Sequence, residues 1–596
     1  MRMRCNVKLV DLSDSCGVPS HSSRSFHQGT DRNGYYFCWV LSRQLWVILT
    51  DMRIVIDIET DMKASEIWCA VTKDIDSGEV KVWKEANGLR QYIGEQDLLI
   101  GHNIIGFDIP VLKKAWNLNY ESNPQRDTLI MSRLLNPVIE KGHSLDAWGV
   151  RLGLKKGDFS DFDNGLSEDM VEYCIQDVEI TATLFERLTA DLLDWGQSVD
   201  LEHEVAQVVK KQEETGFKLD VPKAMYTLAN WRQSLIDIEV ELQEIFQPIV
   251  TERYSEKTGR RLKDKVEVFN PGSRKQIAER MMALGWKPKK FTEKGTPIVD
   301  EKVLQTIKRP EAASLQRFLL VQKRVAQVAS WLENADDGGR VHCKVRTNGA
   351  ITGRMTHSSP NLAQVPRVGS EYGEECRSMW TVDDGNVLLG ADASGLELRM
   401  LAHYMDDPSY TKEILEGDIH TKNMEAAGLT NRDQAKTFIY AFLYGAGPAK
   451  IGQIVGGAER EGKMLISSFL KNTPALQKLR DKVDRLAVKE WLPGLDGRRL
   501  LVRSQHAALN TLLQGAGAVV MKQALIILHR KIINGKMNAR FVANVHDEWQ
   551  IETTPQDAET VGHLAVQSIR QAGIRLRLRC PLDGEFKVGT NWAATH

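Results

Sequence analysis

The pattern of apolar and polar residues divides the chain into four consecutive stretches. Residues 1–51 show no clear periodicity, whereas the apolar run 53–60 is typical of a buried strand. From there to about residue 200, strand-like and helix-like segments alternate, as in an α/β domain. Residues 201–345 are largely amphipathic and helical, and residues 346–596 mix strands with helices again. The pattern therefore predicts a multidomain α/β protein.

Composition and charge agree with a globular chain of about three to five domains. The 596 residues are 42% hydrophobic and 26% charged, which excludes a disordered, collagen-like or simple coiled-coil chain. The net charge of −1 neither indicates nor excludes a nucleic-acid partner, because one local groove can bind DNA. The eight cysteines include no C-x-x-C pair, which fits a reducing compartment. No run of 18 apolar residues is present, so we expect no transmembrane helix.

Three short motifs in the first α/β region carry carboxylates. Asp57 and Glu59 lie at i and i+2 of the apolar strand, so their side chains share one face. Asp108 follows another apolar segment, and Tyr173 and Asp177 lie at i and i+4 of a helical segment. Adjacent carboxylates repel each other and are costly to bury unless a divalent cation lies between them. Each motif alone is more often an ordinary strand end or helix-surface pair, but the three together favour a metal site.

A second set of carboxylates lies in the C-terminal region. An apolar strand ends at Asp392, where a metal could also bind the carbonyl of Ala393. Residues 541–551 have the pattern of a hairpin with Asp547 and Glu548 near its tip. Mg²⁺ is usually held by one or two carboxylates together with substrate phosphates. Two acids from distant segments that meet on one sheet would suit such a site.

A stripe of cationic and aromatic residues lies between those two segments. Arg432, Lys436, Tyr440 and Tyr444 recur every four residues and form one stripe on a helix, about 18 Å long. Cations at one end can neutralise a triphosphate, and an aromatic ring at the other can stack on a base. The alternative is an ordinary amphipathic helix with surface charges and core tyrosines.

Taken together, these motifs resemble two known families. The order D-x-E, N-x-x-x-F-D and Y-x-x-x-D resembles DnaQ-like 3′–5′ exonucleases. The C-terminal segments resemble motifs A, B and C of family A (DNA polymerase I-type) DNA polymerases, particularly the replicative enzymes of short-tailed bacteriophages. Further segments that look like family signatures are Phe269–Ser273, Thr352–Arg354, Asn361–Pro366, Gly417–Thr421 and Asn510–Gly515. The resemblance covers residues 53–596.

The resemblance implies an RNase H-like 3′–5′ exonuclease domain joined to a right-hand polymerase domain. The implied ranges are an N-terminal extension at 1–51, an exonuclease domain at 52–200, a thumb at 201–345, and palm and fingers at 346–596 with the fingers at about 411–490. The basic clusters Arg260–Lys265 and Lys287–Lys290 of the thumb would then contact phosphates. We expect residues 1–51 to be dispensable for activity; the alternative is a tail that binds a partner.

The resemblance also implies a role for each candidate site residue, with two Mg²⁺ ions in each active site. The exonuclease residues are the metal ligands Asp57, Glu59, Asp108 and Asp177, and Tyr173, which orients the attacking water. The polymerase metal ligands are Asp392, Asp547 and the carbonyl of Ala393, with Glu548 as an auxiliary acid.

The remaining implied roles concern the nucleotide and the DNA. The nucleotide-binding residues are His420, Arg432 and Lys436 at the triphosphate, Lys436 also as general acid, Tyr444 near the templating base, and Glu397 and Tyr440 at the sugar. The implied primer–template contacts are Arg354, Gln364, Asn510, Gln514 and His546.

The implied function is template-directed DNA synthesis with proofreading, in phage replication in the cytoplasm of an infected bacterium. The implied partners are primer–template DNA and dNTPs, with a replicative helicase/primase and a single-stranded-DNA-binding protein, and no membrane. We do not expect a thioredoxin clamp, because the segment Glu244–Val268 is too short for the thumb insertion that binds thioredoxin in some relatives. Two alternatives are an exonuclease with a decayed polymerase half and a non-catalytic nucleic-acid-binding protein; the intact acids argue against both.

Overall fold

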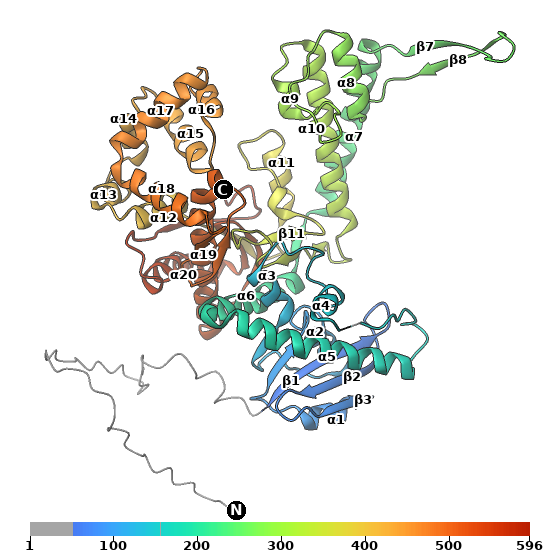
Figure 1. The fold of residues 1–596 in the computed structure, drawn as a ribbon, viewed down its shortest axis with the longest axis vertical. Coiled ribbons are helices and arrows are strands. Elements are labelled where there is room, and N and C mark those ends of the chain that lie inside the picture. The colour runs from blue at the N-terminus through green and yellow to red at the C-terminus, as the bar shows by residue number, and fades with distance from the viewer. Residues whose placement is uncertain (1–51, 155) are drawn as a thin grey trace, which may run out of the picture. The chain divides into compact units, whose positions relative to one another are not determined.

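The described part of the chain is a mixed α/β protein. The computed structural model describes residues 52–154 and 156–596, in which two larger β-sheets are joined by long helices (Figure 1). The expected N-terminal extension, residues 1–51, lies outside the described residues.

A five-stranded sheet forms the first region, in the order β3-β2-β1-β4-β5. Strand β1 (Arg53–Thr60) pairs antiparallel with β2 (Ile67–Asp74) and parallel with β4 (Leu98–Gly101). Its apolar residues are buried because helices cover the sheet. The other strands are β3 (Val80–Trp83) and β5 (Gln125–Asp127). The helices of this region are α1 (Ala86–Tyr92), α2 (Asp108–Trp116), α3 (Thr128–Leu135), α4 (Leu145–Leu152) and α5 (Glu168–Asp191).

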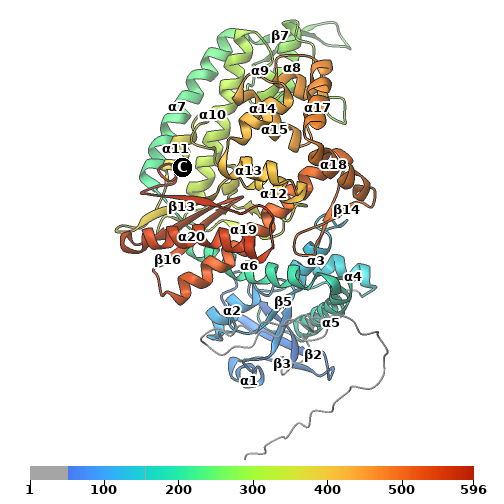
Figure 2. The ribbon, with the colours of Figure 1, turned by 90° about the vertical axis from the view of Figure 1, so that its left-hand side faces the viewer.

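Helix α6 (Gly196–Thr215) lies between this sheet and the C-terminal region (Figure 2). On one side, Nε2 of His203 accepts a hydrogen bond from the backbone N–H of Asp127 at the end of β5, at 2.7 Å. On the other side, the carboxylate of Glu213 accepts from the backbone N–H of Val345 in β10 (Lys344–Arg346), at 2.6 Å. The domain boundary expected between residues 200 and 201 falls inside this helix.

Long helices dominate the next stretch. Helices α7 (Val221–Ile245) and α10 (Pro310–Glu333) pack against each other, and α8 (Arg274–Ala283) and α9 (Glu301–Gln305) lie near one end of the pair (Figure 1). A small sheet in the order β12-β6-β9 lies near the other end. Its strands are β6 (Phe217–Leu219), β9 (Arg340–Val341) and β12 (Trp380–Thr381).

This stretch is not as helical as the sequence pattern suggests. Strands β7 (Ile249–Tyr254) and β8 (Arg261–Glu267) form an antiparallel hairpin that is exposed along nearly its whole length. A turn containing Gly259, at φ 64°, reverses the chain between them, and this left-handed conformation favours glycine. The basic cluster Arg260–Lys265 therefore lies on an exposed strand.

A four-stranded antiparallel sheet forms the core of the C-terminal region, in the order β16-β17-β13-β18. Its strands are β13 (Val387–Ala393), β16 (Ala539–Val545), β17 (Glu548–Thr553) and β18 (Gly584–Gly589). Helices α19 (Ala508–Asn534) and α20 (Pro555–Arg575) pack against each other, and α20 covers β13 and β18. The predicted strand ending near Asp392 and the predicted hairpin at 541–551 are both present.

Seven helices follow β13 and lead towards α19. They are α12 (Leu396–Met405), α13 (Pro408–Glu416), α14 (Ile419–Ala427), α15 (Arg432–Leu443), α16 (Pro448–Ile454), α17 (Glu459–Asn472) and α18 (Pro474–Ala487). Helix α15 has the bounds that the four-residue stripe predicts, with Tyr444 as its C-cap. Strands β14 (Trp491–Pro493) and β15 (Arg499–Leu501) then form a short hairpin before α19.

One helix in the described residues has the length and apolar composition to cross a membrane. It spans Gln505–Asn534, which is α19 with the 3₁₀ turn Gln505–Ala507 before it, but 89% of its most apolar window is buried inside the protein, as in the core helix of a globular domain.

Candidate active sites

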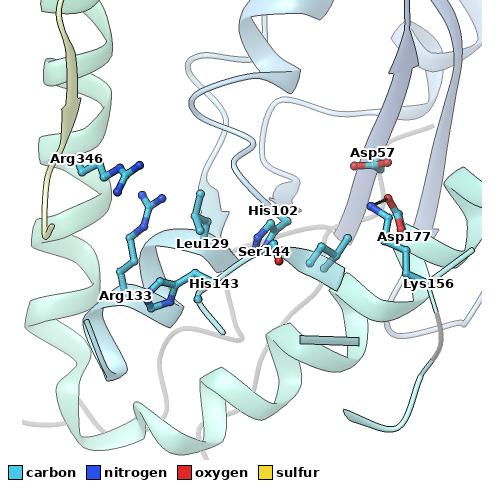
Figure 3. Close-up of a pocket in the computed structure, with 11 residues that line it drawn as sticks. Asp57, His102, Leu129, Arg133, His143, Ser144, Lys156, Asp177 and Arg346 are labelled. Atoms are coloured by element: carbon cyan, nitrogen blue, oxygen red, sulfur yellow. Dashed lines mark ion pairs between the residues drawn. The ribbon is translucent and has the colours of Figure 1, made fainter. Parts of the chain in front are cut away.

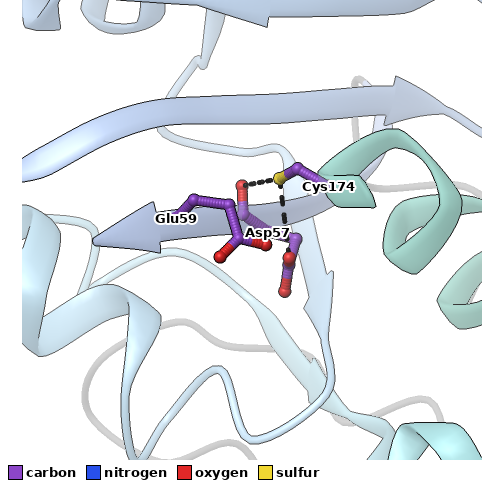
Figure 4. A group of neighbouring side chains, drawn as sticks. All are labelled: Asp57, Glu59 and Cys174. Carbon is purple, nitrogen blue, oxygen red and sulfur yellow. Dashed lines mark hydrogen bonds between the residues drawn. The ribbon is translucent and has the colours of Figure 1, made fainter. Parts of the chain in front are cut away.

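The first sheet and its helices bring the four predicted carboxylates of the first region together. Asp57 and Glu59 lie on β1, Asp108 is the first residue of α2, and Asp177 lies on α5. Ligand atoms of Asp57, Glu59 and Cys174 all lie within 4.8 Å of one another (Figure 4). The thiol of Cys174 donates to the backbone carbonyl and to Oδ2 of Asp57, each at 3.6 Å. Sequence reasoning missed this cysteine, although it lies three residues before Asp177 on the same helix.

Burial sets the electrostatics of this cluster. Loss of solvation, together with the charges of neighbouring carboxylates, raises the pKa of Asp57 to about 7 and that of Glu59 to about 9. Burial also raises the pKa of Asp108 and of Asp177. A group of acids that ionises this reluctantly is stabilised in its charged form by a cation. Oδ1 of Asp177 is buried and has no hydrogen-bond partner among the described residues, so it is available as a ligand. These oxygen donors fit Mg²⁺.

Lys156 is a cation within the same cluster that sequence reasoning did not identify. Its Nζ lies 2.7 Å from Oδ2 of Asp177 and 4.8 Å from the centroid of the Tyr173 ring. The Tyr173 ring also packs against the rings of Phe159 and Phe162, with centroids 5.8 and 6.2 Å away. Tyr173 and Asp177 therefore share a helix face, as predicted, and Lys156 contacts both.

A cavity of about 590 Å³ opens beside these acids (Figure 3). Asp57, Asp177 and Lys156 lie at one end, and Arg133 and Arg346 lie at the other. Burial lowers the pKa of Arg133, and the nearby charge of Arg346 lowers it further.

His102 also lines this cavity. Its Nδ1 lies 2.9 Å from the hydroxyl of Thr128, whereas its buried Nε2 has no partner among the described residues. Such a cavity suits a negatively charged polymer. The cations at one end can bind its charged groups, and a metal ion held by the carboxylates at the other end can contact its reacting group.

The raised pKa values predict that metal binding at this cluster releases protons. Mg²⁺ binds the ionised carboxylates, so its affinity should rise between pH 6 and pH 8, by about tenfold per pH unit for each proton released. Titration calorimetry in two buffers of different ionisation enthalpy measures this release. An Asp392→Asn, Asp547→Asn background confines binding to the first cluster. An affinity that stays constant over this range, with no protons released, would contradict the prediction.

The second predicted set of acids meets at one end of the C-terminal sheet. Asp392 pairs with Glu548 across β13 and β17, and the backbone N–H of Ala393 donates to the carbonyl of Asp547 at 3.1 Å. Burial, together with the charges of Asp547, Glu548 and Glu585, raises the pKa of Asp392 to about 8. As in the first cluster, these oxygen donors fit a divalent cation.

Glu548 differs from the two aspartates because other side chains of the protein already contact both oxygens of its carboxylate. Its Oε1 accepts from the indole N–H of Trp592 at 2.6 Å, and its Oε2 lies 3.0 Å from Nε2 of His596. Burial alone raises the pKa of Glu548, but the interactions of its carboxylate with His596, Arg377 and Trp592 together outweigh burial and leave the pKa below its usual value. Glu548 is therefore fixed in the sheet beside the two aspartates.

Helix α15 presents the predicted stripe. Arg432 at its start is held by Asp418, with Nε donating to Oδ2 at 2.6 Å and Nη2 to Oδ1 at 3.1 Å. The ring of Tyr440 lies between those of His420 and Tyr444, with centroid distances of 6.2 and 6.4 Å. Sequence reasoning identified Arg432 and His420 as candidate site residues. It did not predict that Arg432 pairs with Asp418, because no spacing rule relates those two positions.

Glu397 links the end of that stripe to the loop that carries Arg354. The hydroxyl of Tyr444 donates to the Glu397 carboxylate, at 2.6 Å to Oε2 and 2.8 Å to Oε1. Nη2 of Arg354 lies 3.4 Å from Oε1 of the same carboxylate. The structure therefore joins three predicted site residues that lie on separate segments.

The remaining predicted contacts lie on two further surfaces. Asn510 and Gln514 are the only residues of α19 between positions 508 and 522 that are not buried, so they form one accessible strip. Arg354 and His546 line a common small cavity. Gln364 lies in the 3₁₀ turn Leu362–Gln364, and its backbone carbonyl accepts from the side chain of Gln327 at 3.1 Å.

The chain is similar to one protein family and to several known proteins. The family model described as "DNA polymerase family A" matches residues 242–594. The chain is 34% identical to the DNA-directed DNA polymerases of Enterobacteria phage T3 and Escherichia phage T7, over 91% of this chain and 100% of each relative. It is 26% identical to DNA polymerase I of Aquifex aeolicus, over 85% of this chain and 89% of that protein.

A solved structure has a similar fold. It is described as the POL domain of Pol1 from M. smegmatis in complex with DNA primer-template and dNTP. The TM-score is 0.76 at 19% identity, over 92% of this chain and 96% of that one.

Proposed function

The chain belongs to DNA polymerase family A, and from that premise we propose that it extends a primer at the Asp392–Asp547 site and trims the primer 3′ end at the Asp57–Asp177 site. DNA-directed DNA synthesis is the activity of the family. The observation that carries the second activity is the separate cluster of buried carboxylates on the first sheet. Each cluster lies on its own sheet, so one chain can hold both reactions.

The proposed layout assigns each region a part. The exonuclease domain, of RNase H-like type, is 52–200, the thumb is 201–345, and the palm and fingers are 346–596, with fingers at about 411–490. The mixed five-stranded sheet supports the first assignment, and the antiparallel sheet carrying Asp392 and Asp547 supports the last. Helix α6 joins the first two ranges.

In the polymerase site, Asp392, Asp547 and the carbonyl of Ala393 would hold two Mg²⁺ ions, which stabilise the charge that develops during in-line phosphoryl transfer. Lys436 and His420 bind the triphosphate, and Lys436 donates a proton to the leaving pyrophosphate. Arg432 joins them when it exchanges Asp418 for phosphate oxygens, which offer its guanidinium the same bidentate geometry.

The other side of the nucleotide meets α15 and α12. Tyr444 lies near the templating base, and Tyr440 and Glu397 line the sugar. Arg354, Gln364, Asn510, Gln514 and His546 contact the primer–template. Contacts to minor-groove acceptors, which all correct pairs share, check the shape of a pair without reading its sequence.

In the exonuclease site, Asp57, Glu59, Asp108 and Asp177 would hold two Mg²⁺ ions and Tyr173 orients the attacking water. Lys156 fixes Asp177 and Tyr173 relative to each other. Arg133 and Arg346 are placed to bind phosphates of the strand that enters the cavity.

Primer extension tests the proposal directly. With Mg²⁺ and four dNTPs the protein should extend a recessed primer, and without dNTPs it should shorten a mismatched 3′ end. Trimming without extension would instead favour an exonuclease with a decayed polymerase half. Binding with neither reaction would favour a non-catalytic DNA-binding protein. Products obtained with and without host extract report accessory factors such as a helicase/primase or a single-stranded-DNA-binding protein.

We expect thioredoxin to leave processivity unchanged. The segment Glu244–Val268, where some family members carry a thioredoxin-binding insertion, contains the last two residues of α7 and the hairpin β7–β8. Product lengths measured with a DNA trap, which limits each enzyme to one binding event, should be the same with and without reduced thioredoxin. Much longer products with thioredoxin would overturn this prediction.

A further inference from the structure

Four charged side chains form a buried cluster where α6 packs against α19. Glu202 comes from α6, Asp496 and Arg498 from the loop between β14 and β15, and Lys522 from α19. None of these side chains is more than 3% exposed. Nη1 of Arg498 lies 2.7 Å and Nζ of Lys522 lies 2.5 Å from Oε1 of Glu202. Two acids and two bases leave the cluster neutral.

The cluster supports one particular turn. Nζ of Lys522 donates to the backbone carbonyl of Gly353 at 2.8 Å. Gly353 has φ +74°, and a Cβ placed there would lie 2.8 Å from Nη1 of Arg498. The backbone at Gly353 is therefore held by one cation and packs closely against the other, and both the conformation and the space favour glycine.

The next residue, Arg354, leads from the cluster to the active site. Arg354 contacts the Glu397 carboxylate, which also accepts from the hydroxyl of Tyr444. Lys522 and Arg354 line the same small cavity as His546. Contacts thus connect the buried ammonium group of Lys522, through the Gly353 turn, with three residues of the proposed site: Arg354, Glu397 and Tyr444.

We propose that Lys522 is a positioning residue for primer–template binding, which acts by fixing the Gly353 turn that presents Arg354. The proposal rests on the function proposed for Arg354. Buried ion pairs contribute little net stability, since apolar side chains of similar volume often serve as well. Lys522 differs from such a replaceable pair because it uses one of its donors on a backbone carbonyl outside the cluster.

The test is a charge-neutral double variant, Lys522→Met with Glu202→Gln. It leaves Arg498 paired with Asp496, removes the bond from Lys522 to Gly353, and replaces the Arg498–Glu202 ion pair by a contact to a neutral amide. We expect an unfolding midpoint within a few degrees of the parent, a KM for primer–template raised about tenfold, and a kcat within about twofold. If this variant does not fold, the alternative is Lys522→Gln with Glu202→Gln, which keeps polar groups in the cluster. The glutamine side chain at position 522 is too short to reach the carbonyl of Gly353, so this variant should also raise KM for primer–template.

A second charge cluster, which is partly exposed, offers a control. Ion pairs join Arg340 and Arg540 to Asp383 and Glu552, and Lys218 lies 3.5 Å from Asp383. No ion pair or side-chain hydrogen bond within the described residues joins this cluster to Gly353. Arg340→Met with Glu552→Gln should leave KM for primer–template unchanged. An equal rise in KM in this control, or a KM within twofold of the parent in the Lys522 variant, would overturn the proposal.

Arg354→Ala, measured in parallel, separates failure of the inference from failure of its premise. This variant should raise KM for primer–template at least as much as the Lys522 double variant does. If Arg354→Ala leaves KM unchanged, the DNA contact assigned to Arg354 is wrong. If it raises KM and the Lys522 double variant does not, Arg354 binds DNA without help from Lys522.

Discussion

Alanine at Asp392 or at Asp547 is expected to abolish primer extension while trimming continues. Both carboxylates lie at one end of the C-terminal sheet, and either substitution removes one of the two aspartates proposed to bind the metal ions. We expect kcat for extension to fall by about a thousandfold or more, the order of loss seen when a group that stabilises the transition state is removed. Single-nucleotide extension under rapid-quench conditions measures it.

The converse variant, Asp57→Ala with Glu59→Ala, should lose trimming to a similar degree and keep extension. Its acids lie on the first sheet, on the other side of α6 from the polymerase strands. Each variant is the control for the other, because both proteins must stay folded to retain the remaining activity. If either change removes both activities from a protein with normal thermal unfolding, the two sites are not independent.

Glu397→Ala is expected to increase ribonucleotide incorporation about a hundredfold relative to deoxynucleotides. The hydroxyl of Tyr444 and the guanidinium of Arg354 fix the Glu397 carboxylate, so it cannot move aside for a 2′-hydroxyl at the proposed sugar pocket. Two orders of magnitude correspond to about 2.7 kcal/mol of discrimination between the two sugars.

Tyr444→Phe provides the graded comparison. It keeps the ring but removes the hydroxyl that holds Glu397. Discrimination between ribonucleotides and deoxynucleotides should therefore fall by about tenfold, which is less than in Glu397→Ala. Ratios of kcat/KM for ATP and dATP opposite a template thymine measure both variants. Unchanged ratios in Glu397→Ala would show that another group excludes the 2′-hydroxyl.

Local patterns in the sequence predicted the elements that carry the acids. Asp57 and Glu59 alternate with apolar residues on β1, and α15 repeats its stripe every four residues, so side-chain periodicity alone identified both. The hairpin around Asp547 was likewise evident, because apolar residues flank a short polar tip. Resemblance to the family then joined these elements into two sites.

Contacts between distant segments could not be predicted in this way. Lys156 meets Asp177, and Arg346 faces Arg133, only after the chain has folded, and no periodicity relates the members of either pair. The cluster around Glu202 joins three segments through buried charges that sequence patterns would place on a surface. The exposed hairpin β7–β8 was missed because it lies within a stretch of otherwise amphipathic helices.

The shared helix α6 determines where this chain can be cut. Val199 and Ala206 of α6 belong to apolar clusters of the first region, whereas Val205 and Val209 belong to the core of the C-terminal region. A polymerase-only fragment that starts after residue 200 would lose the first turn of the helix, and one that starts before Gly196 would expose Val199 and Ala206 to water. A useful engineered fragment therefore begins upstream of α6 and replaces those two residues with polar ones.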